Sequence, residues 1–210
     1  MTPTRLGFSN ARMAYDDLLA RLLLTIEQGG LTEKVTALRI TTRYRVKDPF
    51  SDRTIGLAHD ALETFLNSPL QDGSGERMKW NKATIHTWLC MAAKLSHEGS
   101  LPEYRDALIA TIEVVESWRA KRGSPSQHEH GENVPLAIFH DRATARVADV
   151  SSVVLRDLTG WMIFQRTRGT VLPFLVPAEA AWEGINPGVD AERYLSSLST
   201  EIHWGDAGWL

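Results

Sequence analysis

Residues 80–103 read WNKATIHTWLCMAAKLSHEGSLPE, and this stretch decides the fold. Its apolar residues recur every three or four positions, which is the spacing of one helix face: Ile85, Trp88, Leu89, Ala92 and Leu95. Gly99 ends this helix, and Ser100 to Glu103 has the spacing of a capping box that starts another. The sequence therefore predicts two consecutive helices, the second running to about Lys121.

The same spacing predicts four further helices outside this pair. They cover residues 10–28, 53–67, 138–158 and 191–202. Gly29 and Gly30 stop the first, and the Asp190 carboxylate can cap the last.

Two segments allow both a helix and a strand. Residues 31–47 alternate as a strand would, yet Val35, Leu38 and Thr42 could share a helix face. Residues 161–176 fit either a short helix or a hairpin. We therefore expect an all-α single domain over residues 1–210, a bundle of about six or seven helices. The alternative adds one small β-hairpin that pairs residues 38–46 with part of 161–176.

Polar stretches rich in Gly, Ser or Pro predict two loops. One covers residues 68–76, and the other is a flexible surface loop at 123–133, with the sequence GSPSQHEHGEN.

The composition is that of an ordinary folded protein. The chain has 210 residues, of which 43% are apolar and 23% charged, with a net charge of -3. There is no global basic field to attract nucleic acid or anionic lipid. A single cysteine, the absence of a signal-peptide pattern and the absence of a long apolar run predict a cytoplasmic protein without a membrane partner.

Tryptophan is unusually frequent, with seven residues in the chain. Core packing explains them most simply, because each indole buries a large area. The functional alternative is an aromatic-lined pocket for a flat organic molecule.

The main candidate site is the His59–Glu63 pair, four positions apart on the helix predicted at 53–67. His59 falls on an apolar stripe with Ile55, Leu62 and Leu66. One helical turn places an imidazole and a carboxylate side by side, so they can bind one metal ion or form an oriented general base.

His86 on the next helix is the expected third residue of this site. Cys90, Glu113 and Glu116 are further candidate partners. Zinc or another divalent metal ion is the candidate cofactor. The more economical interpretation is a core histidine bonded to a neighbouring side chain, with Glu63 in solvent.

Two other constellations are weaker. His128, Glu129 and His130 could chelate a metal ion, but a solvated loop explains them more simply. The run Arg39, Arg43, Arg45 and Lys47 is a local basic patch for which nucleic acid is an unlikely partner. No nucleotide-binding glycine motif and no serine-nucleophile context is present.

The segment Ala181-Trp182-Glu-Gly-Ile-Asn186, followed by Asp190 to Leu195, resembles part of a fungal family of small helical proteins of unknown function. The order of helices is also similar. The resemblance implies an all-α fold and carries no catalytic residue over to this chain.

These features predict an enzyme, a lyase or isomerase acting on a small organic molecule in an aromatic-lined pocket between helices. His59, Glu63 and His86 are its predicted catalytic or metal-binding residues. A non-catalytic interaction module or homo-oligomer is the alternative, using the tail from Trp204 to Leu210, which is hard to bury completely. Nucleic-acid binding ranks third.

Overall fold

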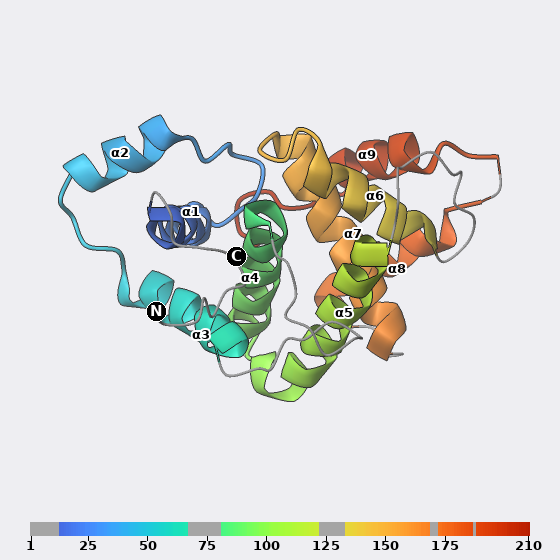
Figure 1. The fold of residues 1–210 in the computed structure, drawn as a ribbon, viewed down its shortest axis with the longest axis horizontal. Helices are drawn as coiled ribbons and strands as arrows, with labels where there is room; N and C mark the ends of the chain where they lie inside the picture. Colours follow the sequence, from blue (N-terminus) through green and yellow to red (C-terminus); the bar gives the residue numbers. More distant parts are fainter. Residues whose placement is uncertain (1–12, 67–80, 122–132, 169–171, 187) are drawn as a thin grey trace.

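Helix α4 (Lys82–His97) lies at the centre of the molecule in the computed structural model, with the other helices around it (Figure 1). It packs against α1, α3, α5 and α7. Every residue from Thr87 to Leu95 is buried, so this helix is apolar on all sides, as a core helix must be. The helix predicted at 80–97 is thus confirmed, and it is the scaffold of the fold.

The structure describes residues 13–66, 81–121, 133–168, 172–186 and 188–210. Within these ranges there are nine α-helices, one short 3-10 helix and no strand, which confirms the all-α class. The helices besides α4 are α1 (Ala14–Gln28), α2 (Ala37–Arg45), α3 (Asp52–Leu66), α5 (Leu101–Lys121), α6 (Asn133–Thr144), α7 (Val150–Arg168), α8 (Val176–Glu183) and α9 (Ala191–Glu201), with the 3-10 helix η2 at Pro173–Leu175.

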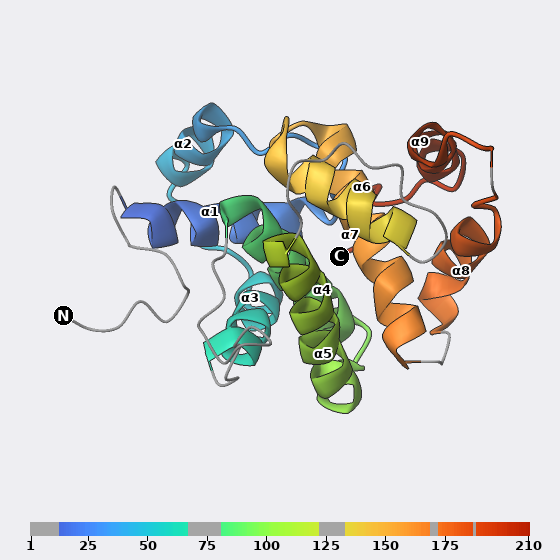
Figure 2. The same cartoon turned by 45° about the vertical axis from the view of Figure 1, so that its right-hand side comes forward.

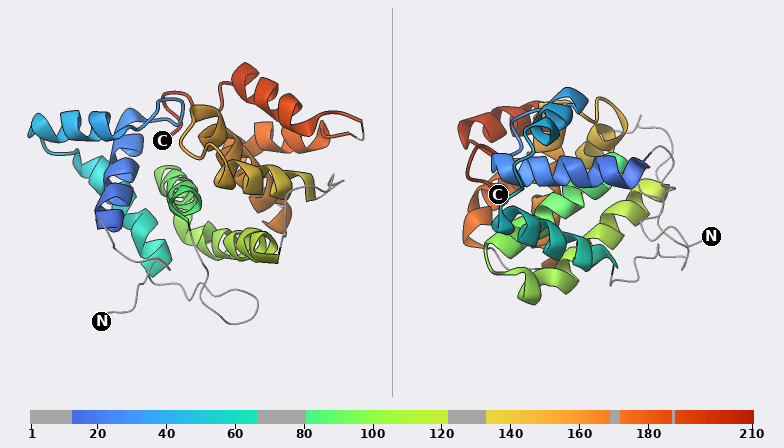
Figure 3. Two further views of the ribbon diagram at one scale, coloured as in Figure 1. Left: turned by 45° about the horizontal axis from the view of Figure 1, so that its top comes forward. Right: turned by 90° about the vertical axis from the view of Figure 1, so that its left-hand side faces the viewer.

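The helices form two groups on either side of α4. α1, α2 and α3 lie on one side, and α5 to α9 lie on the other (Figure 1). α7 is the core helix of the second group, where it packs against α5, α6, α8 and α9. α2 contains no buried residue and lies at the edge of the molecule beside α1 (Figures 2 and 3).

Local sequence signals set several helix ends as expected. Gly29 ends α1 in the left-handed conformation, with φ of 71°. The Asp190 carboxylate accepts a hydrogen bond from the Arg193 amide at 3.1 Å and caps α9. At the start of α4, Asn81 caps the helix by accepting from the Thr84 amide at 2.8 Å. α5 begins at Leu101, directly after Ser100, where the capping-box spacing predicted a helix start. The Ser100 hydroxyl itself donates to the Glu98 carbonyl at 3.3 Å.

The single helix predicted at 138–158 is wrong. The chain leaves α6 at Thr144 and starts α7 at Val150, with a turn between them. The buried Arg156 of α7 holds this turn, because its Nη1 donates to the carbonyls of Arg142 at 2.7 Å and Val147 at 3.0 Å. A side chain beyond the turn therefore satisfies carbonyls that a continuous helix would have paired internally.

The strand alternatives are also wrong. Residues 37–45 form α2, where the Thr36 hydroxyl accepts from the Arg39 amide at 3.2 Å as the helix cap. Residues 161–168 continue α7, so the hairpin with 38–46 does not form. The loop predicted at 68–76 and residues 123–132 of the flexible loop lie outside the described residues.

The segment from His203 to Leu210 packs onto the end of α1. The Leu31 amide donates to the Gly205 carbonyl at 2.6 Å. Both the Gly208 and the Leu210 amides donate to the Gly29 carbonyl, at 2.9 and 3.0 Å. Trp204 and Leu210 are buried, whereas His203, Ala207 and Gly208 are exposed and Trp209 is half-buried, so the tail is incompletely buried, as the sequence predicted.

Three described tryptophans, Trp88, Trp161 and Trp204, belong to the core, and three others, Trp118, Trp182 and Trp209, pack against it, as the simpler interpretation predicted. Trp88 and Trp161 are fully buried, and Trp88 stacks on Phe139 with ring centroids 4.9 Å apart. Trp204 donates its indole N–H to the Asp157 carboxylate at 2.9 Å. No described helix is long and apolar enough to cross a membrane.

Gly30 is a close-approach position that tolerates no side chain. A Cβ atom there would lie 2.7 Å from the carbonyl oxygens of both Gly205 and Asp206. Gly30→Ala is expected to destabilise the protein by about 1–3 kcal/mol, because rigid backbone must move. Gly56→Ala is the matched control: no atom lies within 4 Å of its Cβ, and alanine should stabilise α3 by about 0.5–1 kcal/mol. Urea denaturation of both variants checks the pair, and equal effects would contradict the packing described here.

Asp157 predicts a pH dependence of stability. Burial raises the pKa of Asp157 from 3.8 to about 7, although the hydrogen bond from Trp204 opposes the rise. The folded state therefore holds a proton that the unfolded state has released above about pH 4, so the stability contributed by this proton is lost as pH rises through 7.

Relative to Asp157→Asn, the wild-type free energy of unfolding should fall by about 1–3 kcal/mol between pH 5 and pH 8. Denaturation curves at several pH values measure this difference. Asp106→Asn, on an exposed position of α5, is the control. A difference between wild type and Asp157→Asn that does not change with pH would contradict the assignment.

Candidate functional site

A pocket of about 240 Å³ lies between α1, the start of α4 and the start of α7. It is the candidate site because it joins an apolar cavity to a few convergent polar groups. Its volume corresponds to about eight water molecules in the liquid, so it suits a small organic molecule. The lining residues are Asp17, Arg21, Thr25, Leu31, Glu33, Lys34, Val35, Lys82, Ala83, His86, Val147, Ala148, Val150, Val153 and Arg156.

The pocket wall is aliphatic where it is apolar. Leu31 and Val35 follow α1, Val147 belongs to the turn between α6 and α7, and Val150 and Val153 lie in the first turns of α7. None of the described lining residues is Phe, Tyr or Trp. The described part of the wall is therefore aliphatic and not aromatic as predicted, and the buried tryptophans Trp88, Trp161 and Trp204 belong to the core.

Carboxylate–cation pairs mark one side of the pocket. The Asp17 carboxylate accepts from Arg21 Nε at 3.1 Å and from Lys82 Nζ at 3.2 Å. Burial alone would raise the pKa of Asp17, but these two cations lower it below its ordinary value. Lys34 pairs with Asp149 at 3.1 Å. These pairs fix the polar edge of the pocket and neutralise part of its positive charge.

His86 is the one sequence-predicted site residue that lines this pocket. Its Nε2 lies 3.3 Å from the Thr25 hydroxyl, and its Nδ1 lies 3.8 Å from the Cys90 sulfur. Burial, together with the positive charges of Arg156 and Arg21, lowers the pKa of His86 to about 4. The imidazole is therefore neutral at pH 7, so one ring nitrogen can accept a hydrogen bond or a proton.

Arg156 is the most deeply buried cation of the pocket, with 1% of its surface exposed. Besides the two carbonyls of the α6–α7 turn, its Nε donates to the Thr87 hydroxyl at 3.1 Å. Burial lowers the pKa of Arg156 to about 10, which leaves it positively charged at pH 7. No carboxylate among the described residues forms an ion pair with it.

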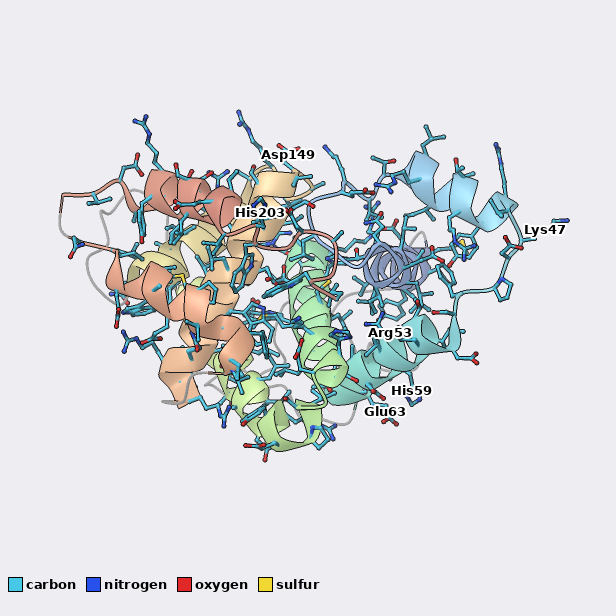
Figure 4. The ribbon with its side chains drawn as sticks, turned by 180° about the vertical axis from the view of Figure 1, so that it is seen from behind. Lys47, Arg53, His59, Glu63, Asp149 and His203 are labelled. Atoms are coloured by element: carbon cyan, nitrogen blue, oxygen red, sulfur yellow. The ribbon has the colours of Figure 1, made fainter. Side chains whose placement is uncertain are left out.

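His59 and Glu63 lie elsewhere, exposed on the outer side of α3 (Figure 4). The apolar stripe assigned to His59 is wrong, since Ile55 and Leu66 are also exposed. The face that packs against α1 and α4 holds different residues: Thr54, Leu57, Ala58, Ala61, Thr64 and Phe65. The expected solvation of Glu63 is confirmed, but the structure does not bring His59 or Glu63 to His86.

The remaining candidate ligands are also dispersed. Cys90 is buried behind His86, and burial raises the pKa of its thiol well above the usual range, so it is no thiolate. Glu116 accepts from the Trp88 indole at 2.9 Å and pairs with Arg119, and burial raises its pKa. Glu113 lies on the same helix as Glu116, α5.

No group of three or more metal-ligating side chains forms among the residues that the structure describes. The predicted set of His59, Glu63 and His86 is therefore not assembled into one site. His128, Glu129 and His130 lie outside the described residues.

The basic run on α2 is partly neutralised within the protein. Arg39 pairs with Glu33, and Arg43 donates to both oxygens of the Glu27 carboxylate at 2.7 Å. Arg45 and Lys47 are exposed, with Lys47 at the outer edge of the molecule (Figure 4). Two exposed cations and two paired ones make a weak electrostatic footprint for nucleic acid.

Sequence reasoning missed Arg156 and Arg21 as site residues. The available signal was Arg156-Asp157 inside the apolar run from Val153 to Leu158. A charged pair in such a run indicates buried charges that need partners. Arg21 carries no such signal, because it lies among exposed and buried positions of an ordinary amphipathic helix.

No family model, no curated protein and no solved structure matches this chain. The resemblance to a fungal family of small helical proteins stays a prediction.

The ring of His86 is expected to titrate with a midpoint near 4. The folded state then stays neutral while the unfolded state takes up a proton below about pH 6.5, so the stability that His86 contributes is lost as pH falls towards 4. Long-range ¹H–¹⁵N spectra of the histidine rings measure the midpoint, with His86→Gln used to assign the resonance. A midpoint at the ordinary value of 6.5 would contradict the burial of His86 beside two arginines.

Proposed function

We propose that this protein binds a small organic molecule in the pocket between α1, α4 and α7. The observation that carries the proposal is the convergence of His86, Arg21 and Arg156 on one aliphatic cavity of about 240 Å³. A concave apolar site with few, well-placed polar groups is the usual form of a small-molecule site. The polar groups would orient the ligand, and the valines would exclude water from it.

Binding is supported better than acid–base catalysis in the free protein. An efficient general base has a pKa near the working pH, whereas the pKa of His86 is about 4. At pH 7 this imidazole is a weak proton acceptor that serves well as a neutral hydrogen-bond partner. Of the three predicted catalytic residues, only His86 lines this pocket. A lyase or isomerase reaction there would require a ligand that raises the pKa of His86.

The interaction-module alternative has less support from the tail than the sequence suggested. Trp204 and Leu210 are buried against the body of the protein, and the backbone of this tail is bonded to Gly29 and Leu31. Ala207 and part of Trp209 are the apolar surface of the tail that stays accessible, a small area for a partner to cover. The proposal of a small-molecule site does not depend on oligomeric state.

A pocket-filling substitution tests the proposed function. Ala83→Phe places a ring in the cavity and should lower the affinity of pocket ligands at least tenfold, whereas Ala120→Phe, at an exposed position of α5, should not. A fragment panel of neutral and charged organic molecules is screened by NMR for changes at the His86 ring. The fragments that respond are then titrated against both variants.

His86→Ala and His59→Ala form a second matched pair, because only the first residue lines the pocket. The affinity of responding fragments should fall in His86→Ala and stay unchanged in His59→Ala. If no fragment perturbs His86, or if responding fragments bind Ala83→Phe as tightly as wild type, the proposed function is wrong.

A further inference from the structure

Arg156 has an unused donor at the pocket. Three acceptors hold its Nε and Nη1, namely the Thr87 hydroxyl and the carbonyls of Arg142 and Val147. Its Nη2 donates to no acceptor in the part of the chain that the structure describes, and Arg156 lines the cavity. The guanidinium is therefore fixed in place on one edge and free to donate on another.

The pocket also holds more cations than carboxylates that pair with them, and Arg156 forms no ion pair with a described carboxylate. Arg21 and Lys82 share the single carboxylate of Asp17, and Lys34 pairs with Asp149. The neutral groups that hold Arg156 satisfy its hydrogen bonds but not its charge. A buried charge without a counter-ion is costly, so this arrangement favours an anionic ligand.

The neighbouring carboxyl, Asp157, compensates Arg156 only in part. Its charge raises the pKa of Arg156, but with a pKa of about 7 it is half protonated at pH 7, its Oδ2 accepts from Trp204, and it does not line the cavity. The lining acid Glu33 pairs with Arg39. No other carboxylate among the lining residues is left for Arg156.

Two helix starts add to the positive potential. Lys82 and Ala83 begin α4, and Val150 begins α7, and all three line the pocket. The amino-terminal end of a helix carries a partial positive charge that stabilises a nearby anion. This contribution supports the anion preference set by Arg156 and does not establish it alone.

We propose that the ligand of this pocket is a small organic carboxylate, whose carboxylate group accepts a hydrogen bond from Arg156 Nη2 while its apolar part packs against Val147, Val150 and Val153. This inference rests on the proposed small-molecule site and names its ligand class. The excess of positive charge favours an anion, and the aliphatic wall matches a hydrocarbon body. An inorganic phosphate ion would leave the valines uncovered.

The test compares two ligands that differ only in charge, hexanoate and hexanamide, on the wild-type protein at pH 7. Hexanoate should bind at least ten times more tightly and should perturb the His86 ring. Inorganic phosphate is the third arm, and it should not displace hexanoate at equal concentration. Equal affinity for acid and amide, or displacement by phosphate, overturns the carboxylate assignment.

Substituting Arg156 itself would remove the hydrogen bonds that stabilise the turn between α6 and α7. The test therefore uses a variant that keeps Arg156. Val153 lies one helical turn before Arg156 and lines the same cavity, so Val153→Glu supplies an internal counter-charge. The acid-to-amide affinity ratio should fall to about one in Val153→Glu and stay above ten in the neutral control Val153→Gln. A ratio that is the same in both variants contradicts a role for Arg156.

The two proposals fail differently. If hexanamide perturbs His86 and binds as tightly as hexanoate, the pocket is a small-molecule site without carboxylate preference. If neither probe perturbs His86, the carboxylate assignment is wrong. If the fragment panel also leaves His86 unperturbed, the small-molecule site is wrong as well.

Discussion

The buried guanidinium of Arg156 is the interaction on which the rest of the structure depends. It joins α7 to α4 through Thr87, to the end of α6 through the Arg142 carbonyl and to the α6–α7 turn through the Val147 carbonyl. Breaking a buried polar network of this kind costs several kcal/mol, because the groups left behind are unsatisfied. The same side chain closes one wall of the pocket, so fold and site share one constraint.

Helix ends with a local signal could be predicted from the sequence, and the break between α6 and α7, which lacks one, could not. Gly29, Gly99 and Asp190 mark ends of α1, α4 and α9 by their own backbone or side-chain chemistry. The turn between Thr144 and Val150 contains neither Gly nor Pro. A residue several positions further on, Arg156, stabilises it, and short-range patterns carry no trace of such a contact.

The candidate site was predicted only in part, for a related reason. Two sets of residues on α3 both have helical spacing, one with His59 and Ile55 and one with Leu57 and Ala61. Packing against α1 and α4 selects the second set, and spacing alone cannot choose between them. His86 was predicted as a partner of His59 and Glu63, but the residues that join it at the pocket come from α1 and α7.

The docking of residues 203–210 on Gly29 and Leu31 has a consequence for how the protein folds. This contact joins segments from opposite ends of the described sequence, and closing so long a loop is entropically expensive until other contacts exist. Leu31 is also a wall of the pocket. We therefore expect the Leu31 wall of the pocket to be completed late in folding, after the local helices and the α4–α7 core have assembled.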